Sequence, residues 1–366
     1  MSMFTKLYRG ETRFDFIGTR RKWYAASMVL ILICLLSFAF RGFNVGIDFK
    51  GGTQFQLPKG TTVTASDAET AMKAAGQTPE GAAQEVGSGS NRQIVIKTKE
   101  LTQDEQSVVA TKLAAGLKVD KASISIDSVS STWGSEITRK AVQGLVVFLI
   151  LVFIYIAIRY EWKMGVGALT ALLHDLIISA GIYSIVGFEL TPSTIVGLLT
   201  ILGFSLYDTV VVFDKVNENV KDLSATARMT YSEAANLAVN QTLMRSINTS
   251  LISLLPVAGL LFVGAGLLGV GTIKDLALIL FIGLAVGAYS SLFLATPIVV
   301  ELKERETEYK TLTKRVLAKR AAAAKSGEPV LAGTASVSGP APRTTGKPSP
   351  APRPGARPAN RGRKRP

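Results

Sequence analysis

Thiol and imidazole side chains are nearly absent from this sequence. Among 366 residues there is one cysteine, Cys34, and one histidine, His174. A single cysteine excludes an intrachain disulfide and a cysteine-based metal site. A single histidine excludes a multi-histidine metal centre and leaves little room for histidine-based catalysis. We therefore expect no metal, no cofactor and no enzymatic activity.

Acidic residues are scarce at both ends of the chain. Residues 309–366 contain 14 Lys and Arg against one acidic residue, and residues 1–22 contain six against two. Residues 43–137 are nearly balanced, with nine basic and eleven acidic residues. Such a basic tail is usually solvated or attracted to anionic lipid headgroups, at about 1 kcal/mol per residue. Ribosome recruitment is the alternative, and we expect no specific nucleic-acid binding.

Six long apolar stretches fill most of the remaining sequence, and 48% of all 366 residues are hydrophobic. At about 1.5 Å per helical residue, each is long enough to cross a bilayer. The first follows the basic flank Arg20–Lys22, but no A-x-A-like cleavage site follows it, so we expect a retained helix rather than a signal peptide. The predicted transmembrane helices cover residues 23–42, 138–158, 164–188, 192–213, 246–266 and 274–300.

Basic residues in short flanks predict the orientation of these helices. Those in Arg20–Lys22, in the turn at 159–163, in the loop at 215–228 and in the tail fall on one side, which is then the cytoplasm. Both termini are predicted to be cytoplasmic, as residues 1–22 and 301–366. The tail is predicted to be disordered from about residue 321. A polar cytoplasmic loop is expected at 214–245, with a short surface helix near Tyr231–Leu243.

The segment 43–137 is predicted to be an extracytoplasmic α+β domain. Alternating apolar residues indicate strands at 54–57, 93–98 and 123–129. Amphipathic helices are expected at 65–75 and 102–117, the second with a capping box of Thr102 and Glu105. The order is ββαββαβ, or βαββαβ if the first two strands act as one, with a turn at 87–91. The second order is typical of a ferredoxin-like fold. The predicted fold class is therefore a membrane all-α bundle of six helices with one small α+β domain.

One aspartate lies inside an apolar stretch. Asp208 belongs to the predicted helix 192–213, where a charge near the bilayer centre costs about 2.5 to 17 kcal/mol. Steps of three and four residues from Asp208 lead to Ser205, Ile201, Gly197 and Thr194. Except at Ile201 this face is small or polar, so it is expected to point inward. Such a residue usually pairs with another group and moves ions or protons.

The next helix supplies a candidate partner, Arg245. It shares one face with Asn248, Thr249 and Ser253, which would complete a polar network around the carboxylate. An arginine lowers the pKa of a neighbouring carboxylate whereas burial raises it, so such a group can load and release a proton. The alternative is a static ion pair that fixes helix packing.

Other polar and small residues in the helices have weaker interpretations. His174 and Asp175 are either a second proton site or a polar pair satisfied by neighbouring helices. Gly203-Phe-Ser205 matches the serine motif of intramembrane proteases only weakly, because His174 would have to serve as the base. Gly283 and Gly287, followed by Ser290 and Ser291, favour close helix packing.

Four ordered motifs resemble the SecD/SecF family of protein-export membrane proteins, and within it the SecF branch. One follows the first helix and matches the GIDFxGGT signature. Another, Asp208–Asp214 with Asn217 and Asn219, is similar to the family's fourth helix, and 240–250 and 288–297 are similar to the fifth and sixth. SecD would carry a larger external domain than 43–137. The signature residues are Gly46, Ile47, Asp48, Phe49, Gly51, Gly52 and Thr53.

The resemblance implies an RND-like subunit in the bacterial plasma membrane that uses the proton-motive force with SecD to complete preprotein translocation. It implies proton-relay roles for Asp208 and Arg245. The implied partners are SecD as a heterodimer, the SecYEG channel, SecA, the translocating preprotein, lipids and protons, with YajC and YidC as further candidates. The alternatives are an RND-like half-transporter of lipids or small molecules and a scaffold whose tail recruits ribosomes.

Overall fold

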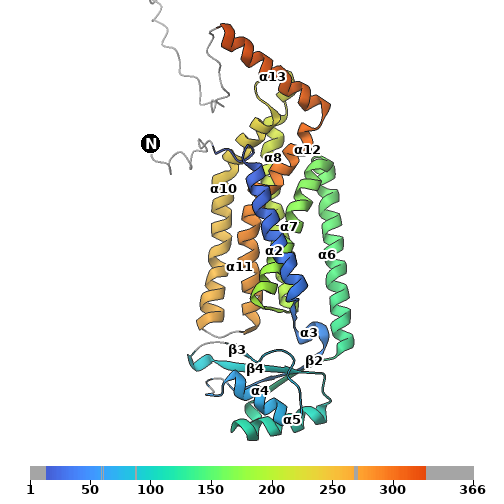
Figure 1. The fold of residues 1–366 in the computed structure, drawn as a ribbon, viewed down its shortest axis with the longest axis vertical. Helices are drawn as coiled ribbons and strands as arrows, with labels where there is room; N and C mark the ends of the chain where they lie inside the picture. Colours follow the sequence, from blue (N-terminus) through green and yellow to red (C-terminus); the bar gives the residue numbers. More distant parts are fainter. Residues whose placement is uncertain (1–13, 59, 61, 87–88, 268–270, 327–366) are drawn as a thin grey trace, which may run out of the picture.

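The protein is an elongated helical bundle with a sheet domain at one end (Figure 1). The computed structural model describes residues 14–58, 60, 62–86, 89–267 and 271–326. In these ranges six helices are long and apolar enough to cross a membrane. They include or continue α2 (Arg20–Phe40), α6 (Ser131–Arg159), α7 (Trp162–Val186), α8 (Pro192–Val220), α10 (Tyr231–Gly259) and α11 (Gly271–Ser290).

The helices α8 and α10 are longer than the sequence predicts. The expected loop at 214–245 is mostly helical, because α8 continues to Val220 and α10 begins at Tyr231. Only the short helix α9 (Leu223–Thr226) and a few linking residues lie between them. A capping box of Thr230 and Glu233 starts α10, and its first turns carry buried alanines that pack in the main core. The expected separate surface helix is therefore the beginning of α10, which runs unbroken into the apolar region.

Three further segments follow α11 and lead to the end of the bundle opposite the sheet domain. The π-helix η4 (Ser291–Ala295) follows α11, then α12 (Thr296–Glu304) and α13 (Thr307–Ser326). The prediction of disorder from about residue 321 is wrong for residues 321–326, which belong to α13. Four consecutive alanines at 321–324 explain this, since alanine has the highest helix propensity. The rest of the predicted disordered tail, 327–366, lies outside the described residues.

The sheet domain follows the predicted order of strands and helices. Its elements are β2 (Gly52–Gln56), α4 (Ala65–Ala74), β3 (Gln84–Val86), β4 (Gln93–Thr98), α5 (Gln103–Leu117) and β5 (Ser125–Val129). The four strands lie in the order β3-β4-β2-β5 and all pairs are antiparallel. The helices α4 and α5 cover the face away from the bundle (Figure 1), around a core that includes Phe55, Met72 and Leu113. The predicted capping box of Thr102 and Glu105 is present.

A tight elbow joins the sheet domain to the bundle. The strand β1 (Asn44–Val45) pairs in parallel with β6 (Glu189–Leu190), and the single-turn helix α3 (Ile47–Lys50) follows. Gly51 has φ +81°, and a Cβ there would lie 2.6 Å from the Ser131 backbone. A Cβ on Gly134 would lie 2.6 Å from the Phe49 carbonyl oxygen. The domain is thus attached through backbone contacts that only glycine permits at these two positions.

Candidate functional site

The site is built around the carboxylate of Asp208 on α8, which is 9% exposed. Its Oδ1 accepts a hydrogen bond of 2.7 Å from Ser246 Oγ of α10, and its Oδ2 accepts one from Ser291 Oγ of η4. The predicted inward face of α8 is confirmed, since Ser205 and Thr194 are also buried. Three helical segments far apart in the sequence therefore meet at one carboxylate.

Close approach of α11 to α8 makes this meeting possible. A Cβ on Gly283 would lie 2.1 Å from Ile201 Cδ1, and one on Gly287 would lie 3.2 Å from Ser205 Cβ. The packing role predicted for these two glycines is confirmed. A larger residue at Gly283 would push α11 away and carry the serines that follow it out of reach of the carboxylates.

Asp208 and Arg245 are not paired in the structure. The ion pairs among the described residues include none between them, and Arg245 is exposed on α10, with Nη2 3.4 Å from the Tyr207 hydroxyl. The reason is helical register: consecutive residues on a helix point about 100° apart, and it is Ser246 that points at Asp208. The predicted contact is therefore replaced by a contact to the neighbouring serine.

The residues predicted to support Asp208 divide into two groups. Thr249 and Ser253 line a cavity of about 30 Å³ together with Ser205 and Asp208, which is room enough for a water molecule. Asn248 is exposed instead. The cavity gives the carboxylate a small polar space on the α10 side.

A second buried carboxylate, Asp175 of α7, lies in the same polar network. It is 1% exposed, and its Oδ2 accepts hydrogen bonds from Ser205 Oγ at 2.6 Å and Ser290 Oγ at 2.8 Å. Its Oδ1 lies 3.2 Å from Nδ1 of His174, so the two predicted polar residues do meet. Because the Ser205 hydroxyl is committed to Asp175, the protease interpretation of this serine has no support from the geometry.

The adjacent residues Ser290 and Ser291 connect the two carboxylates. They stand where α11 changes to the π-helix η4, and each donates to a different aspartate. Each hydroxyl also lies near a backbone carbonyl three residues earlier, at 3.2 Å from Gly287 O and 3.3 Å from Ala288 O. A serine proton can therefore point to the carboxylate or to the carbonyl. If the carboxylate gains a proton, the serine can turn to the carbonyl and accept from the new carboxyl group.

Sequence reasoning missed Ser246, Ser290 and Ser291 as ligands of the carboxylates. The two serines at 290–291 were interpreted only as small packing residues. Buried carboxylates are hydrogen-bonded, so two buried aspartates require several donors from neighbouring helices. Few hydroxyls are available at the same depth, and this scarcity could have identified the three serines.

The signature residues lie away from this site. Gly46, Ile47, Asp48 and Phe49 form the elbow with Gly51, Gly52 and Thr53. Burial, assisted by the negative charge of Glu189, raises the pKa of Asp48 above its usual value. Thr53 Oγ1 accepts from the Leu101 backbone N–H at 3.1 Å. The geometry therefore gives the signature a structural role in attaching the sheet domain.

Comparison with known proteins identifies the family. The model described as "Protein export membrane protein SecD/SecF, C-terminal" matches residues 109–305, and that of the SecD/SecF GG motif matches 36–58. The chain is 48% identical over 324 residues to the protein translocase subunit SecF of Streptomyces coelicolor, covering 88% of this chain and 86% of that relative. The chain belongs to the SecF family. Mycobacterium tuberculosis SecF is also 48% identical, over 345 residues, with 92% and 77% covered.

Solved SecDF structures share the fold. The crystal structure of SecDF from Thermus thermophilus, described as translocon-associated, matches with a TM-score of 0.72 and 33% identity, covering 81% of this chain and 39% of that one. SecDF in a super-membrane-facing form matches with a TM-score of 0.57 and 31% identity, covering 85% and 40%. The SecF-family chain thus spans about two fifths of the SecDF chains that it matches.

These matches settle the class of protein and its general role. With the six apolar helices, they confirm the predicted multi-pass membrane protein with an RND-like helical bundle. Membership in the SecF family makes the chain an accessory subunit of the Sec protein-export translocase. This identity favours export over the half-transporter and scaffold alternatives.

Proposed function

We propose that this SecF-family subunit couples proton movement to the late steps of protein export, with Asp208 taking up and releasing the proton. The observation that carries the proposal is the set of groups around the carboxylate. Two serine hydroxyls hold it, and the ion pairs of the described chain give it no cation. A cation would favour the charged form, whereas hydroxyls can donate to a carboxylate or accept from a carboxyl group.

The network around Asp175 supports the same role. Its carboxylate is also held by serine hydroxyls, and Ser290 and Ser291 belong to one π-helical junction. A change in the charge of either aspartate would reorient a hydroxyl at this junction. Because α11 packs closely on α8, such a change can alter the packing of two long helices together.

Arg245 indicates where a second subunit would bind. An exposed arginine on the side of a membrane-spanning helix is costly unless a partner or water covers it. With Asn248 and Tyr207, it forms an exposed polar strip on α8 and α10. We infer that SecD covers this strip and supplies a counter-charge for Arg245. SecYEG, SecA and the preprotein, with YajC and YidC as further candidates, complete the proposed assembly.

The proposed arrangement places both termini in the cytoplasm and the segment 43–137 outside it, in the bacterial plasma membrane. The βαββαβ order and the antiparallel sheet support a ferredoxin-like domain there. One charge that crosses 100 mV supplies about 2.3 kcal/mol, so a few protons per cycle suffice to bias a domain movement. The work is mechanical, with no covalent chemistry assigned to any residue.

The test is export driven by the proton-motive force in vesicles that contain the complete translocase. Asp208→Asn keeps the shape of the side chain but cannot exchange a proton. We expect late-stage export to lose its dependence on the proton-motive force, while the early ATP-driven steps continue. The matched control is Asp214→Asn, an exposed carboxylate on the same helix. Equal late-stage export by Asp208→Asn and wild type would refute the proposal.

A further inference from the structure

An apolar groove lies between α2, α7 and the η4–α12 segment, on the outside of the bundle. Its volume is about 420 Å³, within the usual range for ligand sites of roughly 300–1,000 Å³. We propose that it binds one acyl chain of a phospholipid whose phosphate lies beside Arg305. The apolar wall includes Met28, Ile31, Leu173, Ile177, Leu294 and Ile298.

The length of the groove matches one leaflet of a bilayer. Along the η4–α12 segment, the lining residues run from Leu294 to Arg305. These two residues are eleven positions apart, or about 16 Å at the α-helical rise. The hydrocarbon core of a bilayer is about 30 Å thick, so one leaflet contributes about half of that. Arg305 follows the C-terminal end of α12, which leads to α13 at the end of the bundle away from the sheet domain (Figure 1). A lipid of the leaflet on the α13 side would therefore fit with its chain in the groove.

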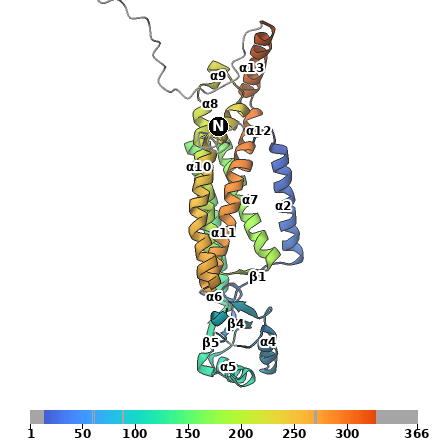
Figure 2. The ribbon, with the colours of Figure 1, turned by 90° about the vertical axis from the view of Figure 1, so that its left-hand side faces the viewer.

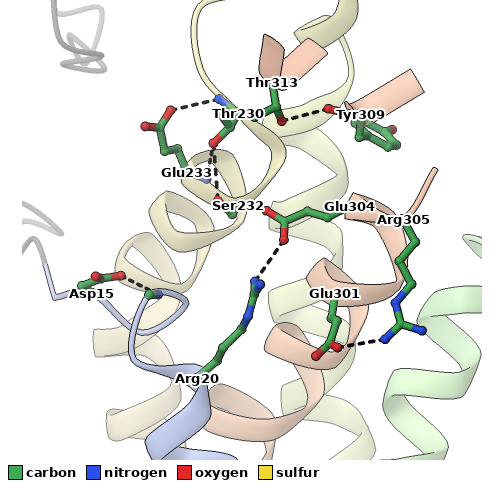
Figure 3. Close-up of polar contacts among 11 residues, drawn as sticks. Asp15, Arg20, Thr230, Ser232, Glu233, Glu301, Glu304, Arg305, Tyr309 and Thr313 are labelled. Carbon is green, nitrogen blue, oxygen red and sulfur yellow. Dashed lines mark hydrogen bonds and ion pairs between the residues drawn. The ribbon is translucent and has the colours of Figure 1, made fainter. Parts of the chain in front are cut away.

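Charged and polar groups gather at the same end of the groove. Figure 3 shows two neighbouring ion pairs there: Arg305 with Glu301 at 3.0 Å, and Arg20 with Glu304 at 3.1 Å. The Arg305 side chain is 70% exposed, so it can turn to a phosphate at the mouth. One turn after Arg20, the buried hydroxyl of Tyr24 lines the groove and has no hydrogen-bond partner among the described residues. A phosphate oxygen at the mouth can accept from the Arg305 guanidinium.

The position of the groove favours a lipid chain over a helix of a partner subunit. The groove lies beside α2, and Figure 2 shows α2 and α10 on opposite sides of the bundle. The exposed polar strip with Arg245, which we assign to SecD, is on the α10 side. A SecD helix at that strip would leave this groove open to the bilayer.

Photolabelling of the assembled complex tests the site. The complex with SecD is reconstituted in phosphatidylglycerol vesicles with a trace of phosphatidylglycerol that carries a diazirine at the end of one acyl chain. Adducts are mapped by mass spectrometry. We expect them to concentrate on Ile31 and Ile177, well above those on Ile150, an exposed residue of α6. Equal labelling at Ile150 would show ordinary surrounding lipid and overturn the proposal, as would cross-links from Ile31 or Ile177 to SecD.

A matched pair of variants tests the phosphate contact. Arg305→Gln should lower the labelling of Ile31 and Ile177 about fivefold, the expected contribution of one basic residue near a charged lipid surface. Glu301→Gln should not lower it, because it removes the carboxylate and leaves Arg305 free. Ile298→Trp should fill the groove and abolish this labelling, whereas Ile150→Trp should leave it unchanged. Unchanged labelling in both Arg305→Gln and Ile298→Trp would overturn the proposal, provided that both variants unfold at the wild-type temperature.

Discussion

Ser246 Oγ lies 2.7 Å from Oδ1 of Asp208, and this contact joins α10 to α8 inside the bundle. The next residue towards the N-terminus, Arg245, points about 100° away on α10 and is exposed. The same turn of α10 thus presents a neutral donor to the buried carboxylate and a cation to the outside. This division leaves the carboxylate with neutral donors and the arginine available to a partner, as the proposed function requires.

Removing the Ser246 hydroxyl should impair the site. Ser246→Ala leaves Oδ1 of Asp208 without its donor, and an unsatisfied buried acceptor costs about 1–3 kcal/mol. We expect the rate of proton-driven export to fall about tenfold, as about 1.4 kcal/mol would produce. Export assays in vesicles measure it. The control is Ser250→Ala, which changes a residue of the adjacent cavity that does not donate to Asp208. A larger loss in the control would contradict the role of Ser246.

Two double-mutant cycles, one for each serine at the π-helical junction, should show which of them contacts Asp208. Ser291 donates to Asp208, so Ser291→Ala should cost little more once Asp208→Asn is present. Ser290 donates to Asp175, so Ser290→Ala should keep most of its own effect in that background. Groups in contact couple by about 0.5–3 kcal/mol, whereas separate ones add. Thermal unfolding of the purified complex supplies the stabilities of the six proteins required, which are the wild type, the three single variants and the two double variants. Equal coupling of both serines to Asp208 would disprove this assignment.

The face of a helix could be predicted from its own sequence, but the register between helices could not. The inward face of α8 follows from Ser205 and Asp208 at a helical spacing. Whether Arg245 or Ser246 meets Asp208 depends on a rotation of about 100° of α10, which the packing of its buried alanines against the core decides. This packing was not predicted, because the polar composition of residues 214–245 is typical of a loop.

The π-helix at Ser291–Ala295 was also beyond the reach of sequence patterns. A π-helical turn has no recognisable pattern within an apolar run of residues. This π-helix nevertheless begins where Ser290 and Ser291 donate to two different carboxylates. The sheet domain was easier, because the period of two and the capping box of Thr102 and Glu105 are local signals. Local rules therefore predicted the elements, and the site required the contacts between them.

Acid should loosen the end of the bundle that carries α13. Burial alone would raise the pKa of Glu306. The ammonium groups of Lys163 and Lys303 outweigh this effect and hold the pKa below its ordinary value. A lowered pKa in the folded state adds stability above the unfolded pKa, and this stability is lost as pH falls through the folded value. The unfolded value is about 4.3. We expect hydrogen exchange in α12 and α13 to accelerate below about pH 4.

The variant Glu306→Gln should show this faster exchange already at pH 7, because Lys163 loses its carboxylate and Lys303 keeps only that of Glu161. The effect should be modest, about 1 kcal/mol or less, since the carboxylate is partly exposed. Glu218→Gln is the control, because Glu218 is an exposed acid that pairs with Lys215 on α8. If Glu306→Gln and Glu218→Gln exchange alike in α13, Glu306 does not hold this end of the bundle.

The elbow should not tolerate a side chain at Gly51. Two effects act there: φ is +81°, which is unfavourable by about 1–2 kcal/mol for other residues, and a Cβ would lie 2.6 Å from the Ser131 backbone. Gly76 has φ +87° and nothing within 4 Å of its Cβ, so Gly76→Ala isolates the first effect. We expect Gly51→Ala to destabilise the protein by about 1–3 kcal/mol more than Gly76→Ala, as overpacking does. Limited proteolysis between residues 43 and 137 and thermal unfolding measure the difference. Equal destabilisation would mean that the Ser131 contact yields easily, and that the signature glycine is needed only for its backbone angle.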